Sequence, residues 1–329
     1  MPTAFVTGAT GFVGSHVAWH LLHQGWKVVA IRRGNSVNPY LPPGEIDWRR
    51  CDVRDADRLV QVMEGCEAVF HVAADYRLWA RDPQEIYQSN VAGTDNVLRA
   101  ARLCRAERVV YTSSVGALGL NPNGTPANEK TPVQLADMIG HYKRSKYLAE
   151  RRAEDHARQG LPVVIVNPST PVGPGDHKPT PTGKIIVDYL NGKMPAYLNT
   201  GLNLVDVEDV ARGHLLALEY GRVGEKYILG NQNLTLAEIF QMLENISGKP
   251  APRLRLPYYP VLCLAYVTEA ISRWTHTEPV IPLEGVKMAH RHMFFDAGKA
   301  VTELGLPQTP VYAALQKAVK WYVDNGYCK

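Results

Sequence analysis

A tyrosine and a lysine four positions apart, Tyr142 and Lys146, are the residues in this sequence best suited to proton transfer. Residues with this spacing share one face of a helix. A free tyrosine has a pKa of about 10 and is a poor base at neutral pH, but a nearby ammonium stabilises the phenolate and lowers that pKa. Tyr142 can then take a proton from a hydroxyl or give one to a carbonyl oxygen, while Ser114 holds that oxygen. Because Tyr-x-x-x-Lys also occurs on solvated surface helices, this interpretation needs a second motif.

The second motif is a run of glycines near the N-terminus, Thr7-Gly8-Ala9-Thr10-Gly11-Phe12-Val13-Gly14. It follows an apolar run at 4–6, opens a helical pattern and leads to a second apolar run at 27–31. Gly8 allows a sharp reversal, Gly11 lets a pyrophosphate approach the backbone, and Gly14 lets the helix pack closely. The helix N-terminus offers N–H groups and a positive dipole end to phosphates. This context favours a dinucleotide site over a ligand-free turn, with these binding residues: Gly8, Thr10, Gly11, Phe12, Val13 and Gly14.

The end of the second predicted strand indicates which dinucleotide binds. An acidic residue there would hold the adenosine ribose 2′-hydroxyl, as in NAD(H) sites. This chain has Arg32 and Arg33 instead. A guanidinium binds a 2′-phosphate with two charge-assisted hydrogen bonds, whereas a carboxylate repels it. We therefore expect NADP(H) rather than NAD(H), with Arg32 on the phosphate; Arg33 also suits a solvated surface charge.

Strand and helix patterns alternate through the first 167 residues, with strands predicted at 4–6, 27–31, 46–51, 68–72, 108–112 and 162–166. This alternation predicts an α/β fold with a doubly wound parallel sheet (Rossmann type) and ligands at the strand C-terminal ends. Residues 1–167 would form the dinucleotide-binding domain. Residues 168–183 hold five prolines and three glycines and predict a loop. The rest, 168–329, would form mainly a smaller α/β substrate lobe that returns to the main domain around 203–220. Four helices and a short strand are expected there, at 184–191, 207–220, 236–247, 312–325 and 227–229.

Composition narrows the functional classes. Hydrophobic residues make up 45% of the chain, charged residues 21%, and the net charge is +4. Without a long basic run, we expect no nucleic-acid partner. Five cysteines lack C-x-x-C spacing, which suits reduced thiols in the cytoplasm, and eleven histidines show no metal-binding spacing, so no metal is expected.

No signal peptide precedes the first predicted strand, and the longest apolar stretch, 258–271, is interrupted by Glu269 and too short to span a bilayer. No transmembrane segment is expected. The stretch suits a helix packed on the second lobe better than one lying against a membrane surface, which would make the protein peripheral to the membrane.

Several motifs together resemble the extended short-chain dehydrogenase/reductases, the superfamily of NAD-dependent epimerases and dehydratases. The resemblance covers essentially the whole chain. Within the superfamily, the chain is most similar to the dihydroflavonol-4-reductase-like branch and, within that, to the hopanoid-associated sugar epimerase proteins. The superfamily motifs are the glycine turn, HVAA at 71–74, NVAGT at 90–94, TSS at 112–114 and Tyr142-x-x-x-Lys146; the closer likeness lies in HVAADYRLW at 71–79, IGHYKRSK at 139–146, VNPSTPVGP at 166–174, KPTPTGKIIVDYLNGKMP at 178–195 and TGLNL at 200–204.

The resemblance implies roles for particular residues. Ser114, Tyr142 and Lys146 match the catalytic serine, the acid/base and its lysine partner, and Lys146 would also bind the nicotinamide ribose. Asn90 matches an asparagine that mainly holds backbone near the active site. The residues implied to line the cofactor are Asp52, Val53, Ala73, Ala74, Thr112, Tyr142, Lys146 and Pro168, and an arginine at Arg32 reads the 2′-phosphate.

Three functions remain open at this stage. The first is net carbonyl reduction, or the reverse oxidation, with NADP(H) on a sugar-like, polyol or lipid-linked small molecule. The second is epimerisation or dehydration of a sugar-type substrate with transient use of the cofactor, in line with the hopanoid resemblance. Sugar epimerases usually carry an acidic residue at the Arg32 position, which favours the first. The third is a cofactor-bound structural or sensing protein, and the intact Ser114, Tyr142 and Lys146 argue against it. A homodimer is the expected assembly.

Overall fold

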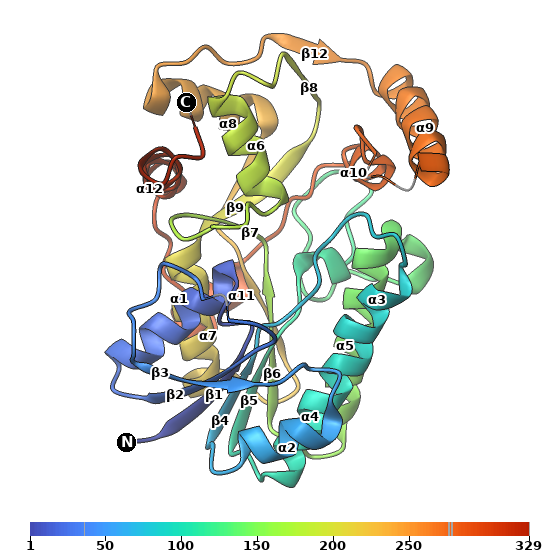
Figure 1. The fold of residues 1–329 in the computed structure, drawn as a ribbon. Coiled ribbons are helices and arrows are strands. Elements are labelled where there is room, and N and C mark those ends of the chain that lie inside the picture. The colour runs from blue at the N-terminus through green and yellow to red at the C-terminus, as the bar shows by residue number, and fades with distance from the viewer. Residues whose placement is uncertain (36, 276, 278, 329) are drawn as a thin grey trace.

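The computed structural model describes residues 1–35, 37–275, 277 and 279–328. Its largest element is an all-parallel sheet of seven strands in the order β10-β6-β5-β4-β1-β2-β3. The strands are β1 (Thr3–Thr7), β2 (Lys27–Arg32), β3 (Ile46–Arg50), β4 (Ala68–His71), β5 (Arg108–Thr112), β6 (Val163–Pro168) and β10 (Lys226–Leu229). The predicted α/β fold with a doubly wound parallel sheet is confirmed (Figure 1).

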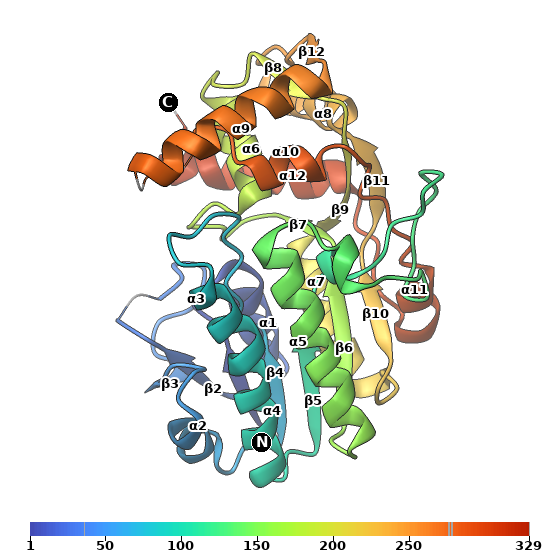
Figure 2. The same cartoon turned by 90° about the vertical axis from the view of Figure 1, so that its right-hand side faces the viewer.

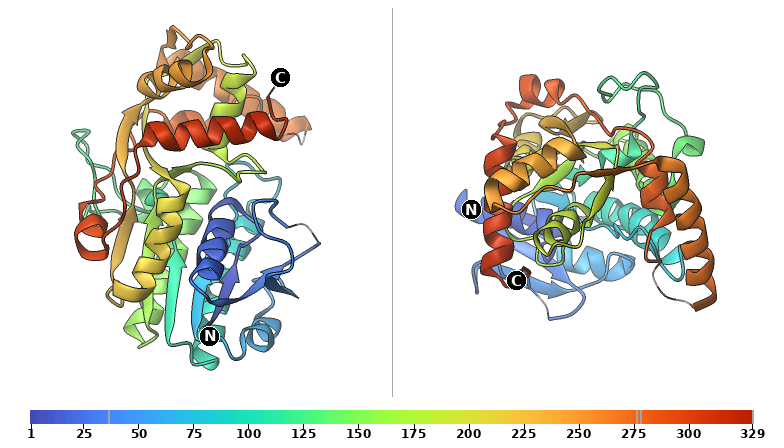
Figure 3. Two further views of the ribbon diagram at one scale, coloured as in Figure 1. Left: turned by 90° about the vertical axis from the view of Figure 1, so that its left-hand side faces the viewer. Right: turned by 90° about the horizontal axis from the view of Figure 1, so that it is seen from above.

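Helices cover both faces of this sheet (Figures 2 and 3). Strands of this kind are rich in β-branched residues and buried on both sides, as β6 is along its whole length. Each face therefore has its own apolar core. One face carries α1 (Phe12–His23), α7 (Val207–Tyr220) and α11 (Gly298–Leu304), and the other carries α2 (Ala56–Met63), α4 (Gly93–Leu103) and α5 (Gly140–Arg158). Short helical turns complete this part: α3 (Gln84–Tyr87), the π-helix η1 (Gln88–Ala92), and the 3₁₀ turns η2 (Val115–Ala117) and η3 (Leu135–Asp137).

The strand order reverses direction at β1. This strand pairs with β2 on one side and with β4 on the other, so the connections leave it in opposite directions. Thr7 and His71, the last residues of β1 and β4, are paired in register. Ligands of open α/β sheets bind at such a reversal, beyond the carboxyl ends of the strands.

A smaller lobe lies over those carboxyl ends (Figure 1). It has its own apolar core, built around residues such as Tyr189, Phe240 and Tyr322. Its strands form two small sheets, β11-β9-β7 and β12-β8. The elements are β7 (Thr170–Val172), β8 (Ala196–Leu198), β9 (Gly201–Asp206), β11 (Gln232–Thr235), β12 (Leu254–Leu256), α6 (Pro181–Leu190), α8 (Leu236–Ser247), α9 (Tyr258–Thr275), α10 (Leu283–Met288) and α12 (Val311–Asp324).

Two features of the chain path differ from the prediction. The prediction of a loop over 168–183 is wrong in part, because Thr170–Val172 forms β7 and α6 begins at Pro181. β7 is an edge strand, where a proline such as Pro171 costs no ladder bond on its free side. The short strand predicted at 227–229 is β10, which pairs with β6 in the main sheet. The chain therefore stays with the main sheet beyond residue 220.

The apolar stretch that begins at Tyr258 forms α9, which packs on α10 through buried Ala265, Leu283 and Val286. It lies at the periphery of the second lobe (Figure 3). Exposed large side chains on it are Tyr259, Leu264, Tyr266, Val267, Ile271 and Trp274. In the part of the chain that the structure describes, no helix combines the length and apolarity needed to cross a bilayer.

Candidate functional site

The glycine turn joins β1 to α1 at the reversal of strand order. Gly8 has φ +77°, and a Cβ there would lie 2.6 Å from the backbone nitrogen of Ala73. A Cβ on Gly14 would lie 2.2 Å from the Gly8 carbonyl oxygen, so only glycine permits this close approach of helix and strand. Gly11 caps α1 without a side-chain hydrogen bond, which leaves N–H groups of the first turn for a ligand. The turn therefore fits a dinucleotide pyrophosphate, and it also carries Thr10, Phe12 and Val13.

A buried asparagine that no sequence motif marks fastens this turn to the second lobe. The Asn38 amide nitrogen lies 3.1 Å from the Gly11 carbonyl oxygen and 3.0 Å from that of Gly175. The side-chain oxygen accepts a hydrogen bond from the backbone N–H of Tyr40. An asparagine in a proline-rich loop gives no sequence signal for such a role, because its partners lie far away along the chain.

A chain of hydrogen bonds links the ends of β1 and β4. His71 lies 2.8 Å from Thr7 Oγ1 through Nδ1 and 3.0 Å from Thr94 Oγ1 through Nε2. Burial lowers the pKa of His71 to about 3, so the ring is neutral at pH 7. Thr7 Oγ1 also accepts from the backbone N–H of Ala73, at 3.0 Å. The network fixes the backbone after β4, where the cofactor residues Ala73 and Ala74 are predicted.

Asn90, which stands in η1, holds the next stretch of backbone. Its Oδ1 accepts from the backbone N–H of Asp75 at 2.7 Å, and its Nδ2 donates to the Asp75 carbonyl and to Ser145 Oγ, both at 2.8 Å. These contacts tie the loop after Ala74 to α5. Asn90 is therefore a positioning residue here, which agrees with the role that the resemblance implies for it.

Three side chains converge beside Gly116. A Cβ on this glycine would lie 3.2 Å from Ser114 Oγ, 3.5 Å from Lys143 Cγ and 3.8 Å from Tyr142 Cε1. Ser114 starts η2, and its Oγ accepts a hydrogen bond from the Gly116 N–H at 3.0 Å. The structure thus brings Ser114 and Tyr142 together from β5 and α5. Lys143 joins them, although no sequence motif marks it.

Burial dominates the acid–base properties of this site. It raises the pKa of Tyr142, and a hydrogen bond with Ser114 works in the opposite direction. The expectation that the Tyr142 pKa is lowered is therefore wrong for the chain by itself, because desolvation of the phenolate raises that pKa and the opposing effect comes from Ser114 rather than from Lys146. Burial also lowers the pKa of Lys146 to about 8, against the favourable charge of Glu150. Lys146 Nζ donates to the Thr112 carbonyl at 2.8 Å, which anchors it at the end of β5.

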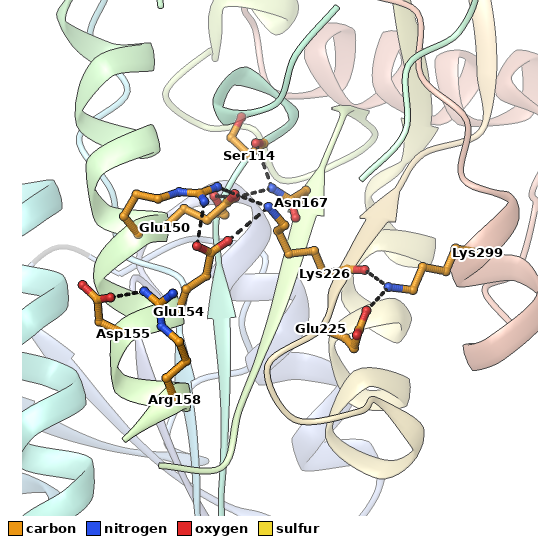
Figure 4. Close-up of polar contacts among 11 residues, drawn as sticks. Ser114, Glu150, Glu154, Asp155, Arg158, Asn167, Glu225, Lys226 and Lys299 are labelled. Carbon is orange, nitrogen blue, oxygen red and sulfur yellow. Dashed lines mark hydrogen bonds and ion pairs between the residues drawn. The ribbon is translucent and has the colours of Figure 1, made fainter. Parts of the chain in front are cut away.

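A buried polar network lies beneath Ser114 (Figure 4). Glu150 is fully buried, and its Oε2 accepts from Ser113 Oγ at 2.6 Å and from Asn167 Nδ2 at 2.7 Å. Its Oε1 lies 3.1 Å from Lys226 Nζ. Asn167 also donates to the Ser114 carbonyl, at 3.0 Å. The network therefore holds the backbone that carries Ser114. The sequence indicates it only through Glu150, which lies one helical turn after Lys146.

At the end of β2, Arg32 donates to the Asn35 carbonyl at 3.2 Å, and its guanidinium carbon lies 5.4 Å from the centre of the Trp48 ring. Among the described residues, no carboxylate forms an ion pair with it. Asp52, by contrast, is paired with Arg54 at 2.9 Å, which holds the Asp52 pKa below its usual value. Other predicted cofactor residues end a strand or follow one at the same edge: Val53, Ala73, Ala74, Thr112 and Pro168.

Comparison with known proteins agrees with this geometry. Residues 4–230 match the family model described as the NAD dependent epimerase/dehydratase family. The chain is 49% identical to "Putative dihydroflavonol 4-reductase" of Synechocystis sp., over 99% of this chain and 96% of the relative. It is 33% identical to sterol demethylase protein B of Methylococcus capsulatus, over 98% of this chain and 99% of the relative.

Solved structures agree as well. The crystal structure of gox2253 superposes with a TM-score of 0.89 at 44% identity, covering 100% of this chain and 99% of the other. PA4631, a nucleoside-diphosphate-sugar epimerase from Pseudomonas aeruginosa, gives a TM-score of 0.82 at 29% identity with the same coverage. Reductases and epimerases among these proteins support an NAD(P)-dependent oxidoreductase or epimerase. The chain belongs to the NAD dependent epimerase/dehydratase family, the extended short-chain dehydrogenase/reductases.

Proposed function

We propose that this protein is an NADP(H)-dependent reductase that converts a carbonyl to an alcohol, or catalyses the reverse oxidation, on a sugar-like, polyol or lipid-linked small molecule. The observation that carries the proposal is the convergence of Ser114 and Tyr142 beside Gly116, with Lys146 anchored one helical turn further along. Residues 1–167 would bind the dinucleotide, and residues 168–329 would mainly bind the substrate. We further propose a cytoplasmic location for this enzyme.

The chain's own residues would act as follows. The glycine turn and the first turn of α1 hold the pyrophosphate, and Lys146 holds the ribose next to the nicotinamide. The bound nicotinamide supplies the hydride. Ser114 Oγ donates a hydrogen bond to the substrate oxygen, and Tyr142 gives that oxygen a proton as the alcohol forms. Because the raised pKa keeps Tyr142 protonated at neutral pH, the phenol is ready to act as the acid in the direction of reduction.

Arg32 supports NADP(H) as the cofactor. Its guanidinium stands at the end of β2 and, among the described residues, has only the Asn35 carbonyl as a hydrogen-bond acceptor, so it can still bind a 2′-phosphate. A replaceable NADP(H) suits net reduction, and the reductase name of the Synechocystis relative points the same way. The second candidate, a sugar epimerase that uses the cofactor transiently, is favoured by the likeness to the Pseudomonas epimerase.

A substrate screen that follows NADPH absorbance and product stereochemistry together tests the proposal. A reductase consumes one NADPH for each alcohol formed, whereas an epimerase inverts a centre without net consumption. Inversion without NADPH consumption would overturn the reductase assignment in favour of the epimerase.

Tyr142→Phe is the variant that tests the proton transfer. It should lower kcat by ~10²–10⁴-fold, because the phenol handles the proton, and leave NADPH binding almost unchanged. Tyr147→Phe, on the same helix, serves as the matched control and should keep wild-type kcat. Near-normal activity of Tyr142→Phe on a substrate that the wild type turns over would refute the proposed role.

A further inference from the structure

Lys143 is a buried lysine at the candidate site for which the proposed mechanism has no use. It follows Tyr142 on α5, and only 9% of its surface is exposed. Among the residues that the structure describes, its Nζ has one polar contact, with the thioether sulfur of Met293 at 3.7 Å. Thioether sulfur is a weak acceptor and carries no charge. Within the described ranges, no carboxylate forms an ion pair with Lys143.

An unpaired buried ammonium is costly, and proteins normally pair such a charge. The other buried lysine of this helix, Lys146, lies near Glu150, whose charge favours its protonated form. Lys143 has no such neighbour: burial alone lowers its pKa, to about 8. Most of it is therefore still charged at pH 7. The missing partner is thus an anion that the described residues do not supply.

The position of Lys143 indicates where that anion belongs. Its Cγ, Ser114 Oγ and Tyr142 Cε1 all lie within 3.8 Å of one point, the place of a Cβ on Gly116. Met293 lies beside β9 of the second lobe, where its N–H donates to the Gly201 carbonyl. The ammonium therefore lies between the acid/base residues and the second lobe. The pyrophosphate cradle is a separate feature, at the start of α1.

We propose that Lys143 binds a carboxylate of the substrate, close to the carbon that carries the reacting oxygen. One ammonium matches the single charge of a carboxylate better than the double charge of a phosphate ester. Tyr142 would then contact the reacting oxygen of the substrate, and the adjacent Lys143 would contact a nearby carboxylate. The substrate class is therefore a 3-hydroxy or 3-oxo carboxylate. This inference rests on the proposed function, because it takes Tyr142 as the group that meets the reacting oxygen.

The test uses full-length protein saturated with NADP⁺, so that cofactor phosphates are already bound. The probes are 3-hydroxyoctanoate, its methyl ester and inorganic phosphate, and binding is measured by calorimetry at pH 7. We expect the acid to bind the wild type more tightly than the ester. Lys143→Met should weaken binding of the acid by ~10–100-fold, the effect of one charge-assisted hydrogen bond, and leave the ester unchanged. Arg144→Met, which removes an exposed cation from the same turn, should match the wild type.

Equal affinity of acid and ester for the wild type, no binding of either, or unchanged acid binding by Lys143→Met would overturn the proposal. Binding of inorganic phosphate but not of the acid would overturn the carboxylate assignment. Turnover separates this inference from the reductase proposal. Acid binding that depends on Lys143, without NADPH oxidation by any carbonyl compound, would leave the anion site standing and refute the reductase. Equal kcat/KM for 3-oxooctanoate and its methyl ester would support the reductase and refute the anion site.

Discussion

The region beneath Ser114 and the region around Lys143 differ in whether a buried charge has partners within the protein. Beneath Ser114, Glu150 is satisfied by Ser113, Asn167 and Lys226, so the charge has a complete set of protein partners. Around Lys143, the one polar contact of the ammonium within the described part of the chain is a sulfur atom. The two regions are separated by less than two turns of α5. The difference teaches that a charge which holds the fold is paired within the chain, whereas a charge left without a partner is available to a ligand.

The strongest test of the paired side is Glu150→Ala. Removing one member of a buried charge network leaves the others desolvated without partners, so we expect a loss of about 3–5 kcal/mol in the free energy of unfolding. Glu154→Ala is the matched control, because Glu154 also lies 3.1 Å from Lys226 but is partly exposed, and it should cost about 0–1 kcal/mol. Urea denaturation at pH 7 measures both. Equal losses of unfolding free energy in the two variants would show that the burial of Glu150 does not increase its contribution to stability.

The unpaired side should respond in the opposite direction. With a pKa of about 8 in the folded chain and the ordinary value of 10.5 in the unfolded chain, Lys143 binds fewer protons when folded between these limits. The loss of folding stability caused by burying the charged Lys143 is therefore complete below pH 8. It decreases as the pH rises towards 10.5. Lys143→Met should stabilise the fold by up to about 3 kcal/mol at pH 7.

That gain should shrink as the pH rises from 7 to 10, because the wild-type lysine then loses its charge. Thermal unfolding of wild type and variant across this range measures the difference, and other titrating groups cancel in the comparison. A variant that is less stable than the wild type at pH 7 would show that Lys143 has a stabilising partner after all.

The smallest expected effect concerns Arg32, a less buried counterpart of Lys143, since it too lacks a carboxylate partner among the described residues. Arg32→Asp replaces a phosphate donor with a hydroxyl acceptor and should move the ratio of NADPH to NADH affinity by ~10-fold or more towards NADH. Arg33→Asp is the control and should change the ratio less. Titration of both nucleotides by protein fluorescence measures the ratio. Equal wild-type affinities would contradict the assignment of NADP(H).

The sequence predicts the elements of the main sheet well, because local patterns determine them. β5 spans Arg108–Thr112 as expected, and α7 and α8 also have the predicted bounds. The tight contacts of Gly8 and Gly14 were likewise foreseeable, since each depends on one absent side chain. β7 was not, because its three residues pair with β9 more than thirty positions later.

For the site, the sequence pattern predicts that Ser114, Tyr142 and Lys146 lie close together. Their roles in catalysis remain predictions. The pattern does not reveal Asn38 or Lys143, and for Glu150 it gives only the position one helical turn after Lys146. The role of each residue depends on partners from distant parts of the chain, or on the lack of a partner, and local residue spacing cannot show either. The raised pKa of Tyr142 was missed for a related reason, since burial depends on the whole fold.

The return of the chain to the main sheet at β10 has a consequence for protein synthesis. β6 ends at Pro168, and its outer neighbour β10 ends at Leu229, about 60 residues later. Ribosomes add roughly 5–20 residues per second, so the edge of β6 emerges some seconds (roughly 3–12) before the strand that covers it. An apolar strand with free N–H and C=O groups is a template for pairing with other chains. During those seconds the nascent chain can aggregate through that edge. A ribosome-associated chaperone that covers the edge should therefore raise the soluble yield of the full-length protein.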